Sequence, residues 1–91
     1  MWGSNMGSLK QCVKERDEAL QKGNVQEFRK FITKWKDMFP ESTYRQLQVA
    51  SDLVLLITMH KMILAVTTMP EEVKAKSRKW LLDRGYKLTI Y

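Results

Sequence analysis

The sequence is short of the side chains that build covalent cross-links and metal sites. It has one cysteine, Cys12, and one histidine, His60. A disulfide within the chain and a zinc site of four thiolates are therefore excluded. No loop places Asp or Asn at alternate positions and no glycine-rich turn follows a strand, so we expect neither a metal ion nor a cofactor. A single free cysteine is typical of the reducing cytoplasm, and we expect a cytoplasmic protein.

Long apolar runs are absent as well. The most apolar stretch, residues 53–59, is flanked by Asp52 and Lys61. It is far shorter than the run of about 20 apolar residues that a membrane-spanning helix needs. The first residues carry neither the positive charge nor the apolar segment of a secretory leader. We therefore expect no membrane partner and no export.

The chain is expected to form one domain. Residues 1–8 repeat Gly-Ser and hold a second Met, a pattern that is typical of the remnant of a cloning tag. The remaining residues, 9–91, have the length of a single small domain. With 44% hydrophobic residues, 4 Gly and 2 Pro, the composition is that of a folded globular protein rather than a disordered one.

Apolar residues recur at helical spacing in four segments, which predicts an all-α fold. The first helix is expected over residues 9–22, with Ser8 as its N-cap and Gly23 as its stop. The second is expected over residues 24–39, because Asn24 is a good N-cap and Pro40 cannot continue a helix.

The third expected helix is the longest, over residues 43–67. Its middle, residues 53–57, is apolar on every side, which is typical of a helix buried on every side. Residues 70–85 predict a fourth helix, and the alternating pattern of residues 86–91 predicts an extended tail. The expected architecture is a compact four-helix bundle around one long central helix, with a short extended C-terminal tail.

Positive charge is concentrated near the C-terminus. The net charge is +6, from 16 Lys and Arg against 10 Asp and Glu. Trp80 lies among the cations of the last helix and tail, and a basic strip with an aromatic residue is one signature of nucleic-acid binding. The alternative is a solvated basic face with Trp80 in the core. The candidate residues for an anionic partner are Lys74, Lys76, Arg78, Lys79, Arg84 and Lys87.

A second candidate surface is a protein interface. Phe31 and Met38 widen the apolar stripe of the second helix, beside Lys34, and Trp80 adds a fourth candidate. Aromatic residues and Met that a small bundle cannot bury would form an exposed patch, and such patches mark interfaces. Six Met, three Trp and three Phe are enough for self-association to be considered. A homodimer and a complex with a different protein are both open.

Catalysis has little support in the sequence. His60 and Asp52 are eight positions apart on the expected long helix, so they do not form an obvious pair. Cys12 lies on the apolar stripe of the first helix, where a packed thiol is expected rather than a reactive one. We predict no catalytic residue, and a small helical enzyme is the remote alternative.

Three segments resemble small proteins carried by prophages and mobile elements of Gram-positive bacteria. They are residues 12–20 (CVKERDEAL), 59–61 (MHK) and 76–86 (KSRKWLLDRGY). The resemblance implies a cytoplasmic, non-enzymatic accessory protein that binds or inhibits a host protein, and it carries over no functional residue. The sequence thus predicts a small helical protein-interaction module, with nucleic-acid binding through the last helix as the alternative.

Overall fold

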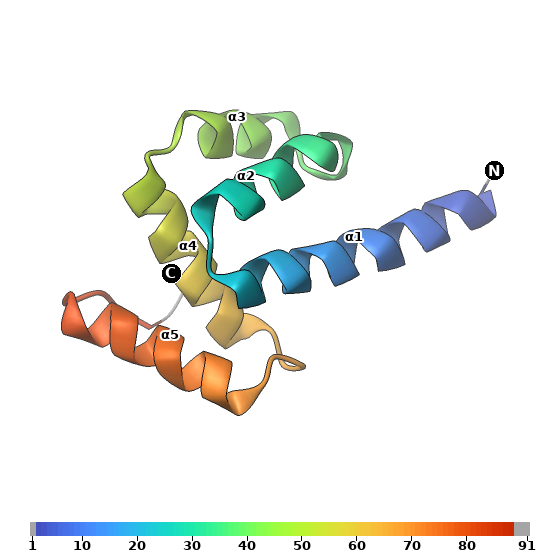
Figure 1. Cartoon of the computed structure of the whole chain (residues 1–91). Helices are drawn as coiled ribbons and strands as arrows, with labels where there is room; N and C mark the ends of the chain where they lie inside the picture. Colours follow the sequence, from blue (N-terminus) through green and yellow to red (C-terminus); the bar gives the residue numbers. More distant parts are fainter. Residues whose placement is uncertain (1, 89–91) are drawn as a thin grey trace.

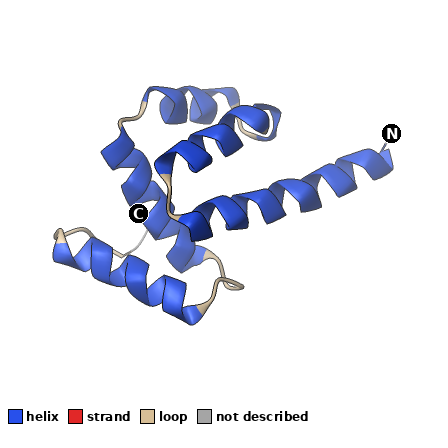
Figure 2. Cartoon of the chain, in the orientation of Figure 1, coloured by secondary structure: helices blue, strands red, loops and turns tan. Residues whose placement is uncertain are grey.

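The computed structural model describes residues 2–88, with side chains from residue 8 onward. Over this range the chain is all helical, which confirms the predicted class (Figures 1 and 2). Five α-helices and one 3₁₀ turn follow one another, rather than the four helices expected. Their bounds are α1 Trp2–Lys22, α2 Val25–Lys34, η1 Lys36–Met38, α3 Glu41–Val49, α4 Asp52–Ala65 and α5 Glu71–Asp83.

Helix α1 is longer than predicted, because it continues back to Trp2 and places Ser8 inside the helix rather than at its cap. Its end is as predicted. Gly23 has a φ of +65°, a left-handed conformation that favours glycine, and its N–H donates to the Leu20 carbonyl over 3.1 Å. In Figure 1 the N-terminal half of α1 extends away from the other helices.

Helix α2 begins as predicted and ends early. The Asn24 side chain accepts a hydrogen bond from the Gln26 N–H over 2.8 Å, which caps the helix. The predicted end at Phe39 is wrong, because Trp35 leaves the helical conformation and η1 follows. Pro40 also disfavours a helical Phe39, whose φ of −106° and ψ of 146° are extended.

The predicted long helix over residues 43–67 is wrong, because the chain breaks at Ala50 and Ser51. Both residues are extended, and the Ser51 hydroxyl accepts a hydrogen bond from the Val54 N–H over 3.3 Å to cap α4. Arg29 of α2 fixes the break: its guanidinium donates to the Ala50 carbonyl over 2.7 Å and pairs with Asp52 over 2.8 Å. The long helix is therefore replaced by α3 and α4, which meet at a corner.

The core is built around α4, although this helix has only 14 residues. It packs against α1, α2 and α5, while α3 packs against α2. The molecule measures 46 × 29 × 23 Å along its principal axes. The most deeply buried side chains come from α1, α2, α4 and α5: Leu20, Phe28, Leu55, Met59, Ile63, Ser77 and Leu81.

The end of α5 is closed by backbone hydrogen bonds. The Tyr86 N–H donates to the Leu81 carbonyl over 2.9 Å, and the Gly85 N–H donates to the Leu82 carbonyl over 3.0 Å. With Gly85 at a φ of +78°, this is the Schellman arrangement of a helix C-terminus. Tyr86 therefore belongs to the end of α5 and not to the predicted extended tail, and residues 89–91 lie outside the described residues.

Candidate protein-binding groove

The apolar run of helix α4, residues 53–57, is not covered on every side. Leu53 keeps 50% and Val54 keeps 49% of its surface exposed. Complete burial was predicted from the apolar run, and on this side of the helix the prediction is wrong. The main packing partners of α4 are α1, α2 and α5, and they leave the side that carries Val54 partly open.

An apolar groove opens where α1 passes α2, η1 and α3 on its way to α4. Its volume is about 390 Å³. Leu9 and Val13 of α1 and Met38 of η1 line it and are exposed to solvent. The remaining lining side chains are mostly apolar or small: Cys12, Arg16, Phe28, Phe31, Phe39, Thr43, Leu47, Thr58 and Met62.

A smaller hollow of about 190 Å³ continues the groove along α4. It shares Thr58 and Met62 with the larger hollow, and it adds Val54, Ile57 and Lys61. The Thr58 hydroxyl donates to the Val54 carbonyl over 2.9 Å. Its proton is therefore used within α4, so that Thr58 offers the groove mainly its methyl group. We call the two hollows together the α1–α4 groove.

The length of α1 explains why the groove is open. Helix α1 has 21 residues and α2 has 10, which correspond to about 31 Å and about 15 Å of helix axis. Helix α2 therefore covers only part of the apolar stripe of α1. Leu9 and Val13 lie on the part that remains open.

The charged side chains that line the α1–α4 groove are all cations. They are Arg16 and Lys61, and no carboxylate lines either hollow. Arg16 pairs with Asp17 over 2.9 Å at the edge, whereas Lys61 has no ion pair among the described residues. The groove therefore combines an apolar floor with positive charge at its rim.

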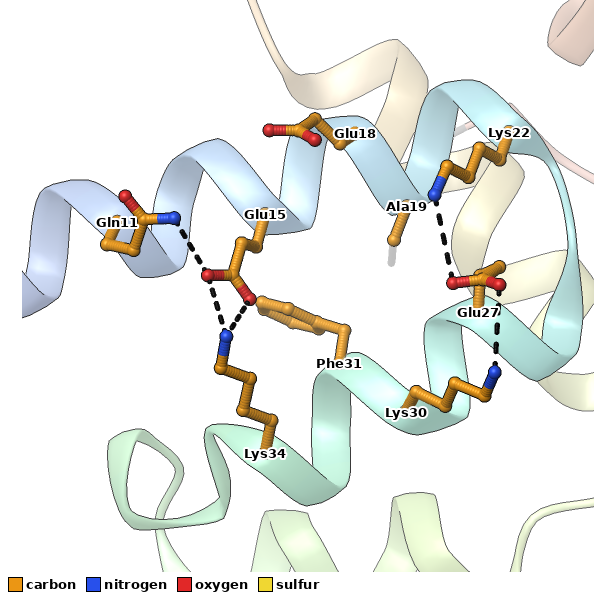
Figure 3. A pocket seen from close by; sticks show the side chains of 9 residues that line it. All are labelled: Gln11, Glu15, Glu18, Ala19, Lys22, Glu27, Lys30, Phe31 and Lys34. Atoms are coloured by element: carbon orange, nitrogen blue, oxygen red, sulfur yellow. Dashed lines mark hydrogen bonds and ion pairs between the residues drawn. The ribbon is translucent and has the colours of Figure 1, made fainter.

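A second cleft, of about 370 Å³, lies between α1 and α2 and is polar (Figure 3). Three Glu and three Lys line it, and they largely neutralise one another. Glu15 accepts hydrogen bonds from Lys34 over 3.0 Å, from Gln11 over 2.8 Å and from the Trp35 indole over 3.0 Å. These donors lower the pKa of Glu15 to about 2. The cleft holds α1 and α2 together and leaves little unsatisfied charge for a ligand.

The four predicted interface residues lie apart. Phe31 is only 7% exposed and belongs to the core, so it offers a partner almost no surface. Lys34 is engaged by Glu15 in the polar cleft. Trp80 lies on α5 against α4, and only Met38 presents apolar surface in the groove. The exposure of Leu9 was not predicted from the sequence. Apolar spacing shows which side chains share one side of a helix, but it does not show which other elements cover that side.

The histidine is part of a contact between α4 and α5. His60 Nδ1 and the hydroxyl oxygen of buried Ser77 share a hydrogen bond of 2.9 Å. The His60 ring also stacks on Trp80, with 4.4 Å between ring centroids. Burial lowers the pKa of His60 below its ordinary value of 6.5, and the charge of Arg84 lowers it further. This geometry fastens two helices together, and the Ser77 hydroxyl that it engages is buried, with Ser77 only 1% exposed.

The other candidates for catalysis are separated. Asp52 pairs with Arg29, so its carboxylate is engaged away from His60. Cys12 is buried as predicted, and burial raises the pKa of its thiol. Among the side chains of residues 8–88, no three His, Cys, Asp or Glu lie close enough together to hold a metal ion.

The predicted basic strip does not form one continuous surface on α5. Successive residues of a helix turn by about 100°, so Lys74 and Arg78 lie on one flank and Lys76 and Lys79 on the other. Exposed Leu82 lies between the flanks. Three of the cations are also engaged: Arg78 with Glu71 over 3.6 Å, Lys79 with Asp83 over 2.9 Å, and Arg84 over the Trp80 ring at 4.2 Å. Lys87 lies beyond the helix and is exposed.

Comparisons with protein-family models, with curated proteins and with solved structures found no match to this chain. The resemblance to prophage and mobile-element proteins therefore stays a prediction that rests on its three segments. Among residues 2–88, no helix joins the length and the hydrophobicity that a membrane crossing requires.

Proposed function

We propose that this chain is a small, non-enzymatic protein-binding module and that the α1–α4 groove is its binding site. The observation that carries the proposal is the uncovered apolar side of α4, with the exposed Leu9, Val13 and Met38 beside it. Single exposed apolar residues are ordinary on protein surfaces, whereas a contiguous apolar groove is typical of an interface.

A partner that covers the groove would bury exposed apolar side chains, and this burial would contribute to the stability of the complex. Each half-exposed Leu, Val or Met that a partner buries contributes about 1 kcal/mol, which is roughly half the value for full burial. The four exposed apolar residues that line the groove are Leu9, Val13, Met38 and Val54. Their sum supplies only part of the free energy that association needs, because the freedom lost on binding costs about 4–15 kcal/mol. The polar and charged contacts at the rim and the buried part of the partner must supply the rest.

The proposal covers two kinds of partner. One is a different protein, and the resemblance to prophage-borne proteins would make it a protein of the host cell. The other is a second copy of this chain, as the apolar composition first suggested. The basic face of α5 is the weaker candidate, because its cations are divided between two flanks and three of the six candidate cations are engaged.

Site-specific photo-crosslinking tests the proposal. A photoreactive amino acid is placed at Val13 or Met38 in the groove, and in matched variants at Val49 or Leu82. Val49 and Leu82 are also exposed and apolar but lie outside the groove. In the cells that produce the protein, the groove positions are expected to form one discrete cross-linked product, and its mass shows whether the partner is a second copy.

The control positions show whether cross-linking is specific to the groove. Equal cross-linking at all four positions would indicate non-specific adhesion of exposed apolar residues. Cross-linking at Leu82 alone would place the interface on α5. Either result contradicts the groove as the binding site.

A further inference from the structure

The rim of the α1–α4 groove indicates what kind of partner it accepts. The groove runs along α4 from Val54 to Met62, eight residue steps of about 1.5 Å, or about 12 Å. That length equals about two turns of a helix. An amphipathic helix presents residues at i, i+3, i+4 and i+7 on one face over a similar length, and helix-in-groove binding uses that face.

The charges that line the groove favour one class of amphipathic helix as the partner. Of the two cations that line the groove, Arg16 is paired with Asp17, whereas Lys61 has no ion pair among the described residues. No carboxylate lines either hollow, and the chain as a whole carries a net charge of +6. The polar cleft between α1 and α2, by contrast, has Glu and Lys in equal numbers. A partner helix with carboxylates beside its apolar face therefore meets opposite charge, whereas one with Lys or Arg there is repelled.

The same charges disfavour a second copy as the occupant. A two-fold dimer would place the groove of one protomer on the groove of the other, because such interfaces are self-complementary. The cations at both groove rims would then lie in one interface, and no carboxylate of either groove would offset them. Between two chains that each carry +6, such an arrangement is opposed by like-charge repulsion.

We propose that the α1–α4 groove binds an acidic amphipathic helix of a partner protein, with the apolar face of that helix on Leu9, Val13 and Val54 and its carboxylates near Lys61. This inference rests on the proposed function and adds the chemical class of the partner. It needs no covalent step and no cofactor.

Three synthetic peptides test the inference. The first has an apolar stripe at i, i+3, i+4 and i+7 flanked by Glu. The second has the same stripe flanked by Lys, and the third has the composition of the first in scrambled order. Binding of labelled peptide to the intact chain is followed by fluorescence anisotropy. The Glu-flanked peptide is expected to bind roughly tenfold more tightly than either control at low salt.

The preference for Glu should shrink as salt rises from 0.01 M to 0.15 M, because the screening length falls from about 30 Å to about 8 Å. In the chain itself, Lys61→Glu is expected to reduce or reverse the preference. Lys76→Glu makes the same change of net charge on α5, away from the groove, and is expected to leave binding within about twofold. Circular dichroism of both variants checks that they are folded.

The outcomes separate this inference from the proposed function. Equal binding of the Glu-flanked and Lys-flanked peptides, with groove-specific cross-linking retained, overturns the acidic partner and leaves the binding module. Binding of the scrambled acidic peptide as tight as the ordered one shows charge attraction alone and also overturns it. A chain that binds no peptide and cross-links to a second copy through Val13 replaces the acidic helix with a homodimer.

Discussion

Two sides of α4 differ in how completely other residues cover them. Toward α5, the contacts are closed: Leu81 of α5 is fully buried, Ser77 bonds to His60, and Trp80 stacks on the histidine ring. Toward the groove, the same helix leaves Val54 half-exposed, and the Thr58 hydroxyl turns back on its own backbone. The α5 side therefore stabilises the fold, whereas the groove side is available to another molecule.

The largest expected effect is the loss of a buried side chain on the α5 side. Leu81 is 0% exposed and its neighbour Leu82 is 56% exposed. We expect Leu81→Ala to lower the free energy of unfolding by about 3 kcal/mol, because it removes buried methyl groups and leaves a cavity. Leu82→Ala should change it by less than about 0.5 kcal/mol. Urea unfolding measures both changes in the free energy of unfolding. Equal effects would contradict the conclusion that the α5 side of α4 stabilises the fold.

A smaller effect is expected from the protonation of His60. Its pKa is lower in the folded chain than the ordinary value of 6.5, so the unfolded chain binds the proton more readily. The contribution of neutral His60 to the free energy of unfolding is therefore complete above pH 6.5. It is lost as the pH falls from 6.5 through the lowered pKa. Urea midpoints measured across this range should fall on acidification, and His60→Gln should remove that part of the fall.

Glu15 supplies the control, because its carboxyl group titrates in a different pH range. Its pKa is lowered from 4.5 to about 2, so its contribution is present above pH 4.5 and is lost between 4.5 and about 2. Glu15→Gln should leave the change near pH 6.5 intact. If Glu15→Gln abolished the change near pH 6.5, His60 would not be its source.

Local rules predict part of this fold and fail where distant residues decide. Asn24, Gly23 and Gly85 mark helix ends through their own conformational preferences, and each does so in the structure. The break at Ser51 was missed, although a Ser-Asp pair is a good helix start. Apolar periodicity runs through that position, and the contacts of Arg29 with Ala50 and Asp52 that fix the break come from another helix.

The candidate site was harder to predict for a related reason. An apolar stripe shows that a side chain can be buried, while the lengths of the neighbouring helices decide whether it is. Met38 was predicted and lines the groove, whereas Phe31 was predicted and is core. Leu9 and Val13 are open because α2 is about half as long as α1, a relation that no single helix reveals.

The smallest expected effect on stability is on the groove side. Val13→Ala and Met38→Ala should each change the free energy of unfolding by less than about 1 kcal/mol, because both side chains are already exposed in the free chain. The same variants should weaken binding of the Glu-flanked peptide severalfold. Loss of stability comparable to that of Leu81→Ala would show that these residues serve the fold instead.

The most direct measurement is a titration of the methyl-labelled chain with the Glu-flanked peptide, followed by NMR. The account predicts that the methyl signals of Leu9, Val13, Met38 and Val54 shift, while those of Leu82 on α5 stay in place. Shifts confined to α5, or spread evenly over the surface, would contradict the groove as the binding site.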